Sequence, residues 1–374
     1  MIYLIDPRNT TKPYNFELLW ALKNLGVKYK FIGTMPKSIE NPPVHSCNCF
    51  MPFSRGLLGE MPKLASFVSN VSQTPEITSG WLNFKKVLKK EDMVHTLWVT
   101  SPSVESIILP KLHGRIRKLV HTAHNLLPHR ERKSDYQRFK KIYPSFDHIF
   151  LHSPHTKKEF LQLFPEIKHK EVSVISVGNY ENFYKVHDKT TDFAGKTSSY
   201  LVDKYKLNGR VFLFMGPIKS YKGFNVLCDA AKLLKDKHFK ILAHAKWIPK
   251  ENYFIQHSAP LPYQQVGILY RSSDIVVIPY TKISLATPLL EAAYFAKPVI
   301  ASRIGALQDI VRDEKEGFLV EPWSVEELKK AMEKMLNMSE KQLKEMGKSL
   351  KQRSIEKFPW TKIAGQLASI YETS

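Results

Sequence analysis

One stretch decides the fold of this chain: Lys282-Ile-Ser-Leu-Ala-Thr-Pro-Leu-Leu-Glu-Ala-Ala-Tyr-Phe-Ala-Lys-Pro-Val-Ile-Ala-Ser302. It follows Ser273-Asp-Ile-Val-Val-Ile-Pro279, an apolar, β-branched segment with the length of a buried parallel strand. Thr287 is a good N-cap and Pro288 a good first helical residue, because a helix start leaves that N–H unpaired anyway. The next residues continue the helix, and Pro298 to Ala301 read as the following strand. The stretch predicts an α/β unit with a parallel sheet.

The start of this predicted helix is suited to binding an anion. Helix starts in a parallel sheet lie at the carboxyl edge of the strands, where free N–H groups and the helix dipole attract negative charge. The first turn consists of Thr287, Pro288, Leu289 and Leu290, and Glu291 follows within reach of a ligand's hydroxyl groups. The alternative is an ordinary crossover helix with a surface glutamate.

A second turn has the same character. Val211 to Met215 reads as a strand, Gly216-Pro-Ile-Lys-Ser-Tyr-Lys-Gly223 as a basic loop, and Phe224 to Leu234 as a helix. A strand, a loop that begins with glycine and a helix can cradle a phosphate, with the ammonium groups of Lys219 and Lys222 supplying charge. Two turns that are separate in sequence thus point to one diphosphate site.

Composition sets the class of protein. The chain has 374 residues, enough for two domains, and 43% of them are hydrophobic. It contains no apolar run long enough for a membrane span, and its first residues lack the pattern of a signal peptide. Three cysteines, with no second pair to complete a zinc site, favour reduced thiols in the cytoplasm.

The net charge of +21 predicts an anionic partner. Nucleic acid, anionic lipid and phosphate-bearing small molecules all fit. We find no nucleic-acid-binding motif, so peripheral contact with an anionic membrane is the better use of the charge, and a merely solvated lysine-rich surface is the alternative. The segment from Cys49 to Val68 is apolar and interrupted by Pro and Gly, which fits either a packed loop or an interfacial segment beside a lipid-linked acceptor.

The N-terminal part repeats the strand, loop and helix pattern. Ile2 to Ile5 predicts a strand, Asp6 to Tyr14 a polar loop, and Asn15 to Leu25 a helix that Gly26 ends. Because this helix start also faces a sheet edge, we place Asp6 and Asn15 on the acceptor side of a cleft.

Two histidine-bearing strands follow. Asp92 to Trp98 and Lys118 to His124 both read as buried strands that run toward one sheet edge, and His129 lies just beyond the second. The region from Lys111 to Lys133 holds seven Lys or Arg and one acid, a patch that suits a diphosphate-bearing acceptor or a bilayer surface. We place Arg130, within that patch, on the acceptor side.

Three boundaries organise the chain. Residues 1–180 are predicted as an acceptor-binding domain, 181–357 as a nucleotide-sugar-binding domain, and 358–374 as a helix that crosses back to the first domain. A further strand is predicted over Tyr143 to His152, with Ser153 as the cap of the next helix. Residues 188–199 are polar and fit a linker.

The motifs above resemble those of family 4 glycosyltransferases. Pro-Leu-Leu-Glu-Ala, Ala-Lys-Pro-Val-Ile-Ala-Ser, the loop that ends Lys222-Gly223, and His124-Asn-Leu-Leu-Pro-His129 resemble the motifs of that family, the last in the subgroup with His-Asn-x-x-Pro-His. The resemblance implies a GT-B fold, with two Rossmann-like domains whose parallel sheets face a central cleft. It also implies a nucleotide-sugar donor in the second domain and an acceptor in the first.

The resemblance assigns roles to individual residues. Glu291 would hold the ribose, Lys222 and the turn from Gly216 the diphosphate, His124 the donor sugar near the reacting centre, and His129 the acceptor region. Two positions depart from the family pattern. Ile283 stands where the family has a Glu that grips the donor sugar, and Pro217 replaces an Arg, for which we take Lys219 as the substitute.

The predicted activity is transfer of a hexose from a UDP- or GDP-sugar to a saccharide or lipid-linked acceptor in the synthesis of a cell-surface glycan. No cofactor and no metal are expected, since the chain has no Asp-x-Asp motif. His129 is the first candidate for the general base of an inverting reaction, and the leaving phosphate serves as base in a retaining one. The rival functions are a nucleotide-sugar epimerase or hydrolase on the same fold, and a basic non-enzymatic protein that binds lipid or nucleic acid.

Overall fold

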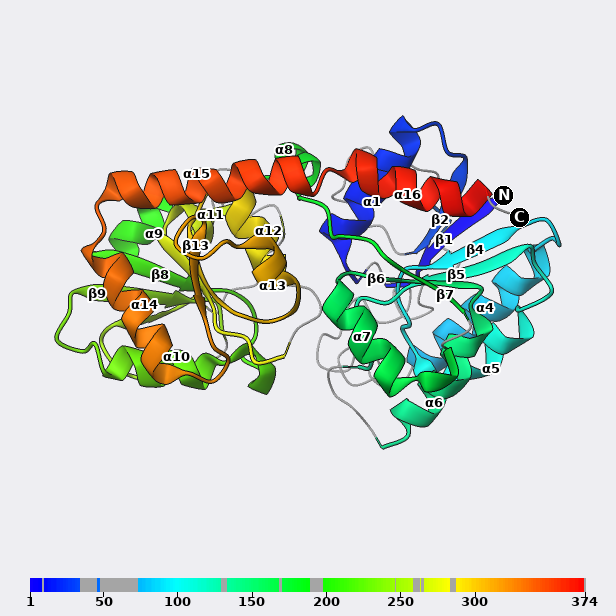
Figure 1. Ribbon diagram of the computed structural model, residues 1–374, viewed down its shortest axis with the longest axis horizontal. Helices are drawn as coiled ribbons and strands as arrows, with labels where there is room; N and C mark the ends of the chain where they lie inside the picture. Colours follow the sequence, from blue (N-terminus) through cyan, green and yellow to red (C-terminus); the bar gives the residue numbers. More distant parts are fainter. Residues whose placement is uncertain are drawn as a thin grey trace, which may run out of the picture. The chain divides into compact units, whose positions relative to one another are not determined.

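The computed structural model describes residues 1–8, 10–33, 46–47, 73–128, 133–167, 170–188, 198–245, 247–257, 263, 266–282 and 287–372. The chain forms two compact units (Figure 1). Unit 1 contains Met1–Val177 together with Trp360–Ser374, and unit 2 contains Gly178–Pro359. Each unit is an α/β layered structure built on a parallel sheet.

The described part of unit 1 holds a seven-stranded sheet in the order β3-β2-β1-β4-β5-β6-β7. Its strands are β1 (Ile2–Asp6), β2 (Tyr29–Gly33), β3 (Ser46–Cys47), β4 (Met93–Thr96), β5 (Lys118–Thr122), β6 (His148–Leu151) and β7 (Glu171–Val174). All neighbouring pairs are parallel. The chain moves outward from β1 in one direction and then from β4 in the other, so the strand order reverses between β1 and β4.

Helices cover both faces of this sheet (Figure 1). They are α1 (Lys12–Asn24), α4 (Gln73–Val87), α5 (Pro102–Ile108), α6 (Asp135–Ile142), α7 (Pro154–Leu163) and α16 (Trp360–Glu372). The side chain of Ser153 accepts a hydrogen bond from the Thr156 N–H, which confirms the predicted cap of α7. Gly26, with φ of 75°, lies just beyond the end of α1, as predicted.

Helix α16 returns to unit 1 from the far end of the chain and packs beside α1 (Figure 1). The Tyr371 hydroxyl lies 2.6 Å from Nδ1 of the buried His95 on β4. Arg117 and Lys118 donate to the carbonyls of Tyr371 and Ile370, at 2.9 and 3.0 Å. Positively charged side chains thus satisfy the carbonyls at the end of the helix, where the dipole is negative.

The described part of unit 2 holds a six-stranded parallel sheet in the order β10-β9-β8-β11-β12-β13. Its strands are β8 (Arg210–Phe214), β9 (Phe239–Ala243), β10 (Phe254–Gln256), β11 (Ile275–Ile278), β12 (Val299–Ser302) and β13 (Gly317–Val320). The order reverses between β8 and β11, because the chain runs outward from β8 to β10 and resumes on its other side at β11.

The helices of unit 2 are α8 (Glu181–His187), α9 (Ser198–Lys204), α10 (Phe224–Lys232), α11 (Val266–Arg271), α12 (Thr287–Tyr294), α13 (Gly305–Ile310), α14 (Val325–Asn337) and α15 (Glu340–Lys357). Helix α10 packs with α14 on one face of the sheet, and α12 packs with α15 on the other (Figure 1). The core between the sheet and the α10–α14 layer includes Phe212, Leu227 and Met332, all of them buried.

Two predicted boundaries are wrong. Helix α1 begins at Lys12, not at Asn15, because Pro13 suits the first turn of a helix and extends it into the predicted loop. The strand predicted over Tyr143 to His152 is confined to His148–Leu151, and Tyr143–Ser145 form a 3-10 turn. Pro144 cannot donate to a sheet ladder, which keeps this segment out of the strand.

Candidate active site

The carboxyl edge of the unit 2 sheet brings the two predicted anion-binding turns together. They follow β8 and β11, the adjacent strands between which the strand order reverses, and ligands of open α/β sheets bind at such points. The Thr281 N–H donates to the Tyr221 carbonyl at 2.8 Å. A side chain on Gly223 would place its Cβ 1.8 Å from the carbonyl oxygen of Pro279. The two turns are therefore in direct backbone contact.

The turn after β8 is closed by Lys222. Its ammonium group donates to the Met215 carbonyl at 3.2 Å and lies 5.4 Å from the centre of the Tyr280 ring. Gly216 has a φ of 91°, and a Cβ there would lie 2.5 Å from the lysine nitrogen. Glycine at this position is therefore required both by the backbone conformation and by the space that Lys222 occupies.

The two lysines of the turn repel each other. Burial lowers the pKa of Lys222 to about 8, and the charge of Lys219 lowers it further, while Glu291 opposes the shift. Lys222 is 9% exposed, whereas Lys219 is partly exposed, with its ammonium 5.8 Å from the Tyr221 ring centre. An anion placed between the lysines would relieve this repulsion.

Helix α12 begins at Thr287, as the sequence predicted, and Leu289 and Leu290 are buried in its first turn. Glu291 is also buried, at 4% exposure. Its two carboxylate oxygens accept from the hydroxyls of Tyr184 and Tyr270, at 2.6 and 2.7 Å. Burial raises the pKa of Glu291, and these two hydrogen bonds and Lys222 work against that increase. A carboxylate has about four acceptor positions, so capacity remains for ribose hydroxyls.

The sequence did not indicate Tyr184 or Tyr270. They lie on α8 and α11, and Tyr184 is separated from Glu291 by 107 positions in the chain. Tyrosine is an ordinary core residue, and only the burial of a predicted ligand-binding carboxylate signals that such partners are needed.

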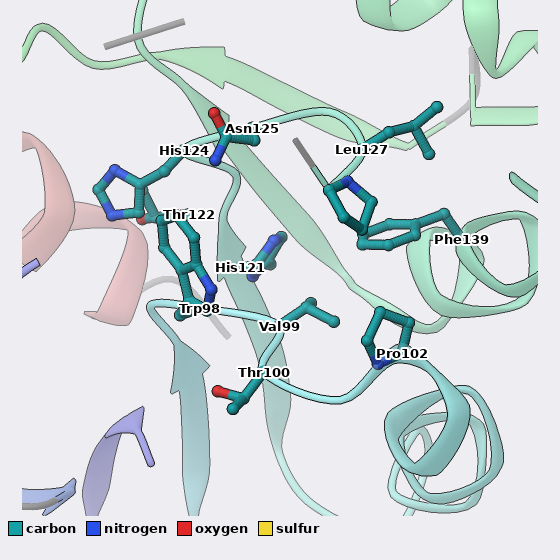
Figure 2. Close-up of a pocket in the computed structure, with 11 residues that line it drawn as sticks. Trp98, Val99, Thr100, Pro102, His121, Thr122, His124, Asn125, Leu127 and Phe139 are labelled. Atoms are coloured by element: carbon teal, nitrogen blue, oxygen red, sulfur yellow. The ribbon is translucent and has the colours of Figure 1, made fainter. Parts of the chain in front are cut away.

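In unit 1, His124 lines a cavity of about 190 Å³ at the carboxyl ends of β4 and β5 (Figure 2). The other lining residues are Trp98, Val99, Thr100, Pro102, His121, Thr122, Asn125, Leu127, Pro128 and Phe139. His124 is 2% exposed and stacks on Trp98, with ring centres 5.4 Å apart. The prediction that β4 and β5 run side by side toward one edge is confirmed.

His124 belongs to a set of buried histidines. Its Nδ1 lies 2.9 Å from Nε2 of His152, and Nδ1 of His152 lies 3.2 Å from the carbonyl oxygen of Ile175. His121, two positions from the end of the helix-free edge formed by this segment, contacts Thr96 in the neighbouring strand. Burial lowers the pKa of His121 and of His152 to about 4, so both imidazoles are neutral at pH 7.

Asp6 and Asn15 hold the β1–α1 loop together. The Asn15 amide donates to the Asp6 carboxylate at 2.8 Å, and the Thr10 N–H donates to the same oxygen at 2.7 Å. Both side chains are buried. Their observed contacts are structural, and an acceptor contact for either residue stays a prediction.

Several predicted features lie outside the described residues. These are His129, Arg130, Ile283, the Cys49–Val68 segment and most of the predicted linker. Among the residues that the structure describes, no three His, Cys, Asp or Glu side chains are grouped so as to hold a metal ion. No helix in that part of the chain is both long and apolar enough to cross a bilayer.

Comparison with known proteins bears on unit 2 first. Residues 202–353 match the family model described as Glycosyl transferases group 1. These residues form a glycosyl transferases group 1 domain. The domain contains both turns, Glu291 and Tyr270, so the predicted donor side lies within it.

Two relatives extend the similarity. An uncharacterized glycosyltransferase of Methanocaldococcus jannaschii is 29% identical over 168 residues, 43% of this chain and 47% of the relative. The match thus spans about half the length of that relative. A D-inositol 3-phosphate glycosyltransferase of Corynebacterium glutamicum is 23% identical over 334 residues, 80% of this chain and 77% of the relative. The group 1 domain and the relatives named as glycosyltransferases support a transferase, as predicted.

Solved structures establish the fold. Sucrose-phosphate synthase from Thermosynechococcus elongatus has a TM-score of 0.72 at 17% identity, covering 99% of this chain and 98% of that one. Anabaena HepE in complex with UDP and glucose has a TM-score of 0.66 at 16% identity, covering 100% and 99%. The predicted GT-B class is confirmed, whereas the subgroup with the His-Asn-x-x-Pro-His motif stays a prediction.

Proposed function

We propose that this protein transfers a hexose from a UDP- or GDP-sugar to a hydroxyl group of a saccharide or lipid-linked acceptor, in the synthesis of a cell-surface glycan. One observation carries the proposal: two lysine- and helix-bearing turns meet at the point where the strand order of unit 2 reverses. The group 1 match over residues 202–353 and the HepE structure with UDP and glucose support a nucleotide-sugar donor.

The diphosphate would lie between the two turns. Lys219 and Lys222 stand close enough for one charge to lower the pKa of the other, an arrangement that favours binding of an anion. The N–H groups of Leu289 and Leu290, in the first turn of α12, add donors and the positive end of a helix dipole. Glu291 would accept from the ribose hydroxyls while Tyr184 and Tyr270 fix its carboxylate.

This arrangement favours the transition state over the ground state. The diphosphate gains negative charge as the bond to the sugar breaks, and groups already positioned toward it stabilise that charge without reorganising. We propose that lysines and N–H groups are sufficient for this task, so that the reaction needs no metal. His129 is the proposed base if the anomeric configuration inverts, and the leaving phosphate is the proposed base if it is retained. NMR of the anomeric carbon in the product distinguishes the two courses.

We further propose that the protein works at the cytoplasmic face of a membrane. Besides the net charge of +21, a groove between α4 and α5 supports this position. Its apolar residues include Leu82 and Ile107, which are 51% and 59% exposed, and Lys85 and Lys111 flank them. Exposed apolar side chains beside lysines suit the surface of an anionic bilayer. Co-sedimentation with vesicles that contain anionic lipid, but not with neutral ones, is the expected result.

A thermal-shift series tests the donor site. UDP, GDP and their sugar conjugates are added to the wild type, and one base is expected to stabilise it, by about 2.7 kcal/mol at a concentration 100 times the Kd. Lys219→Ala and Glu291→Ala should reduce this shift. Lys235→Ala is the matched control, because Lys235 is an exposed lysine just beyond α10. If no nucleotide stabilises the wild type, the proposed donor site is wrong.

A further inference from the structure

The unit 1 cavity contains a polar group that the proposed function has not used, the imidazole of His121. In Figure 2 this ring lies at the centre of the labelled residues, with Trp98 and His124 on one side and Phe139 on the other. One face of the ring is covered by Phe146, with centres 4.8 Å apart and planes 14° from parallel. The ring is therefore held in one orientation at the floor of the cavity.

Its hydrogen bonds assign the tautomer. The Thr96 hydroxyl donates to the Val120 carbonyl at 3.3 Å, so its oxygen is left to accept. Nδ1 of His121 lies 2.8 Å from that oxygen and 2.9 Å from the Thr96 carbonyl oxygen. Because both partners accept, Nδ1 carries the proton. The other nitrogen, Nε2, has an unshared electron pair and accepts hydrogen bonds.

The same reasoning applies to His124. Nδ1 of His152 faces the Ile175 carbonyl oxygen and must donate to it, so Nε2 of His152 is an acceptor. Nδ1 of His124, 2.9 Å from that nitrogen, therefore carries the proton. His152 thus leaves Nε2 of His124 as a second hydrogen-bond acceptor. The low pKa values of His121 and His152 keep this pattern over the physiological range.

The rest of the cavity is apolar or neutral. Trp98, Phe139, Leu127, Pro102 and Val99 form its walls, and no Lys, Arg, Asp or Glu is among the described residues that line it. At about 190 Å³ it is smaller than the roughly 300–1,000 Å³ of sites for drug-sized ligands. Such a space suits one ring that presents C–H groups to aromatic walls and hydroxyl groups to acceptors.

We propose that this cavity binds a neutral polyhydroxylated ring of the acceptor, a monosaccharide or a cyclitol, through hydroxyl groups that donate to Nε2 of His121 and of His124. The inference rests on the proposed function in naming the ring as part of the acceptor. Binding of the ring itself needs no nucleotide, because all the groups involved belong to unit 1.

The test measures binding of free rings by saturation-transfer NMR and calorimetry. The probes are methyl α-D-glucopyranoside, methyl α-D-mannopyranoside and myo-inositol, with cyclohexanol as the ring that lacks most hydroxyl groups. At least one hydroxylated ring should bind saturably without nucleotide, and cyclohexanol should not compete with it. Absence of saturable binding by all three, or binding only when a nucleotide is added, overturns the proposal.

His121→Asn is the decisive variant. The Asn amide replaces Nδ1–H toward the Thr96 carbonyl but offers nothing in place of Nε2, so ring affinity should fall at least about tenfold, or about 1.4 kcal/mol. His148→Asn is the matched control, since His148 is another buried strand histidine but does not line the cavity. Equal affinity in His121→Asn and wild type contradicts the proposal.

Two further readings complete the test. If His121→Asn does not fold, Trp98→Leu replaces it, because Trp98 is partly exposed at the cavity wall, and it should also weaken ring binding. UDP and GDP shifts are measured on the same samples. Ring binding without any nucleotide shift refutes the donor site alone, and a nucleotide shift without ring binding refutes the cavity alone.

Discussion

Replacing Lys222 by Met should make the folded protein more stable while removing donor binding. Lys222 is 9% exposed, and burial lowers its pKa from 10.5 to about 8. At about 1.4 kcal/mol for each pH unit, this difference means that the charged side chain destabilises the folded state at pH 7 by about 3 kcal/mol. Methionine fills a similar volume without charge.

Two favourable contacts are lost with the lysine. The hydrogen bond to the Met215 carbonyl, at 3.2 Å, contributes about 0.5–1.5 kcal/mol. The contact with the Tyr280 ring, at 5.4 Å from its centre, contributes about 0.5–1 kcal/mol. We therefore expect Lys222→Met to raise the free energy of unfolding at pH 7 by about 1–2 kcal/mol.

The pH dependence fixes the origin of this gain. Below pH 8 the folded and unfolded wild type both carry the proton, so the destabilising charge is fully present. Between pH 8 and 10.5 the folded state loses the proton first, and the wild type becomes more stable relative to the variant. The advantage of Lys222→Met should thus be largest near pH 7 and shrink toward pH 10.

Urea unfolding followed by circular dichroism at pH 7 and at about pH 9.5 measures the effect. Lys235→Met, at an exposed position, should show neither the gain nor its pH dependence. A variant no more stable than the wild type at pH 7, or a difference that is the same at both pH values, would refute the reasoning. Donor binding by Lys222→Met, measured on the same preparation, should be lost, so that stability and function oppose each other at this residue.

Three further changes have defined outcomes. Glu291→Ala should lower kcat/KM for the donor by the equivalent of about 1–3 kcal/mol, and unchanged donor kinetics would remove Glu291 from the site. Gly223→Ala should destabilise the protein by about 3 kcal/mol or more in thermal unfolding, because φ is 64° and its Cβ would lie 1.8 Å from the Pro279 oxygen. Gly365→Ala, a helical position with no atom within 4 Å of the added Cβ, should instead stabilise it by about 0.5–1 kcal/mol. Burial raises the pKa of Glu105 from 4.5 to about 7, so its contribution to stability is complete below pH 4.5 and is lost as the pH rises through 7. Urea titrations between pH 4 and 8 should show the wild type losing about 3 kcal/mol relative to Glu105→Gln, and parallel curves would contradict this.

The elements that the sequence predicts best are those with a local signal. Thr287-Pro288 indicates the start of α12, and the β-branched run before it indicates β11, because caps and buried strands depend on neighbouring residues. Strand ends are predicted less well. The segment Asp92 to Trp98 reads as one strand, yet β4 ends at Thr96 and Trp98 lines a cavity. Apolar residues have the same pattern whether they continue a strand or form the wall of a pocket.

Distant partners cannot be predicted from local patterns. Glu291 follows from its motif, but Tyr184 reaches it from 107 positions away and Tyr270 from 21. Likewise His124 has a motif, whereas the assignment of its tautomer depends on His152, 28 positions further along. Only the folded sheets bring these side chains into hydrogen-bonding distance.

The return of α16 to unit 1 has a consequence for biosynthesis. Since Tyr371 supplies the partner of the buried His95, the emerging nascent chain exposes unit 1 before its last helix exists. The ribosome must first translate all of Gly178–Pro359, which takes roughly ten seconds or more at about 5–20 residues per second. During that interval the surface that α16 later covers is open to chaperones, and final closure of the N-terminal unit awaits release of residues encoded near the other end of the message.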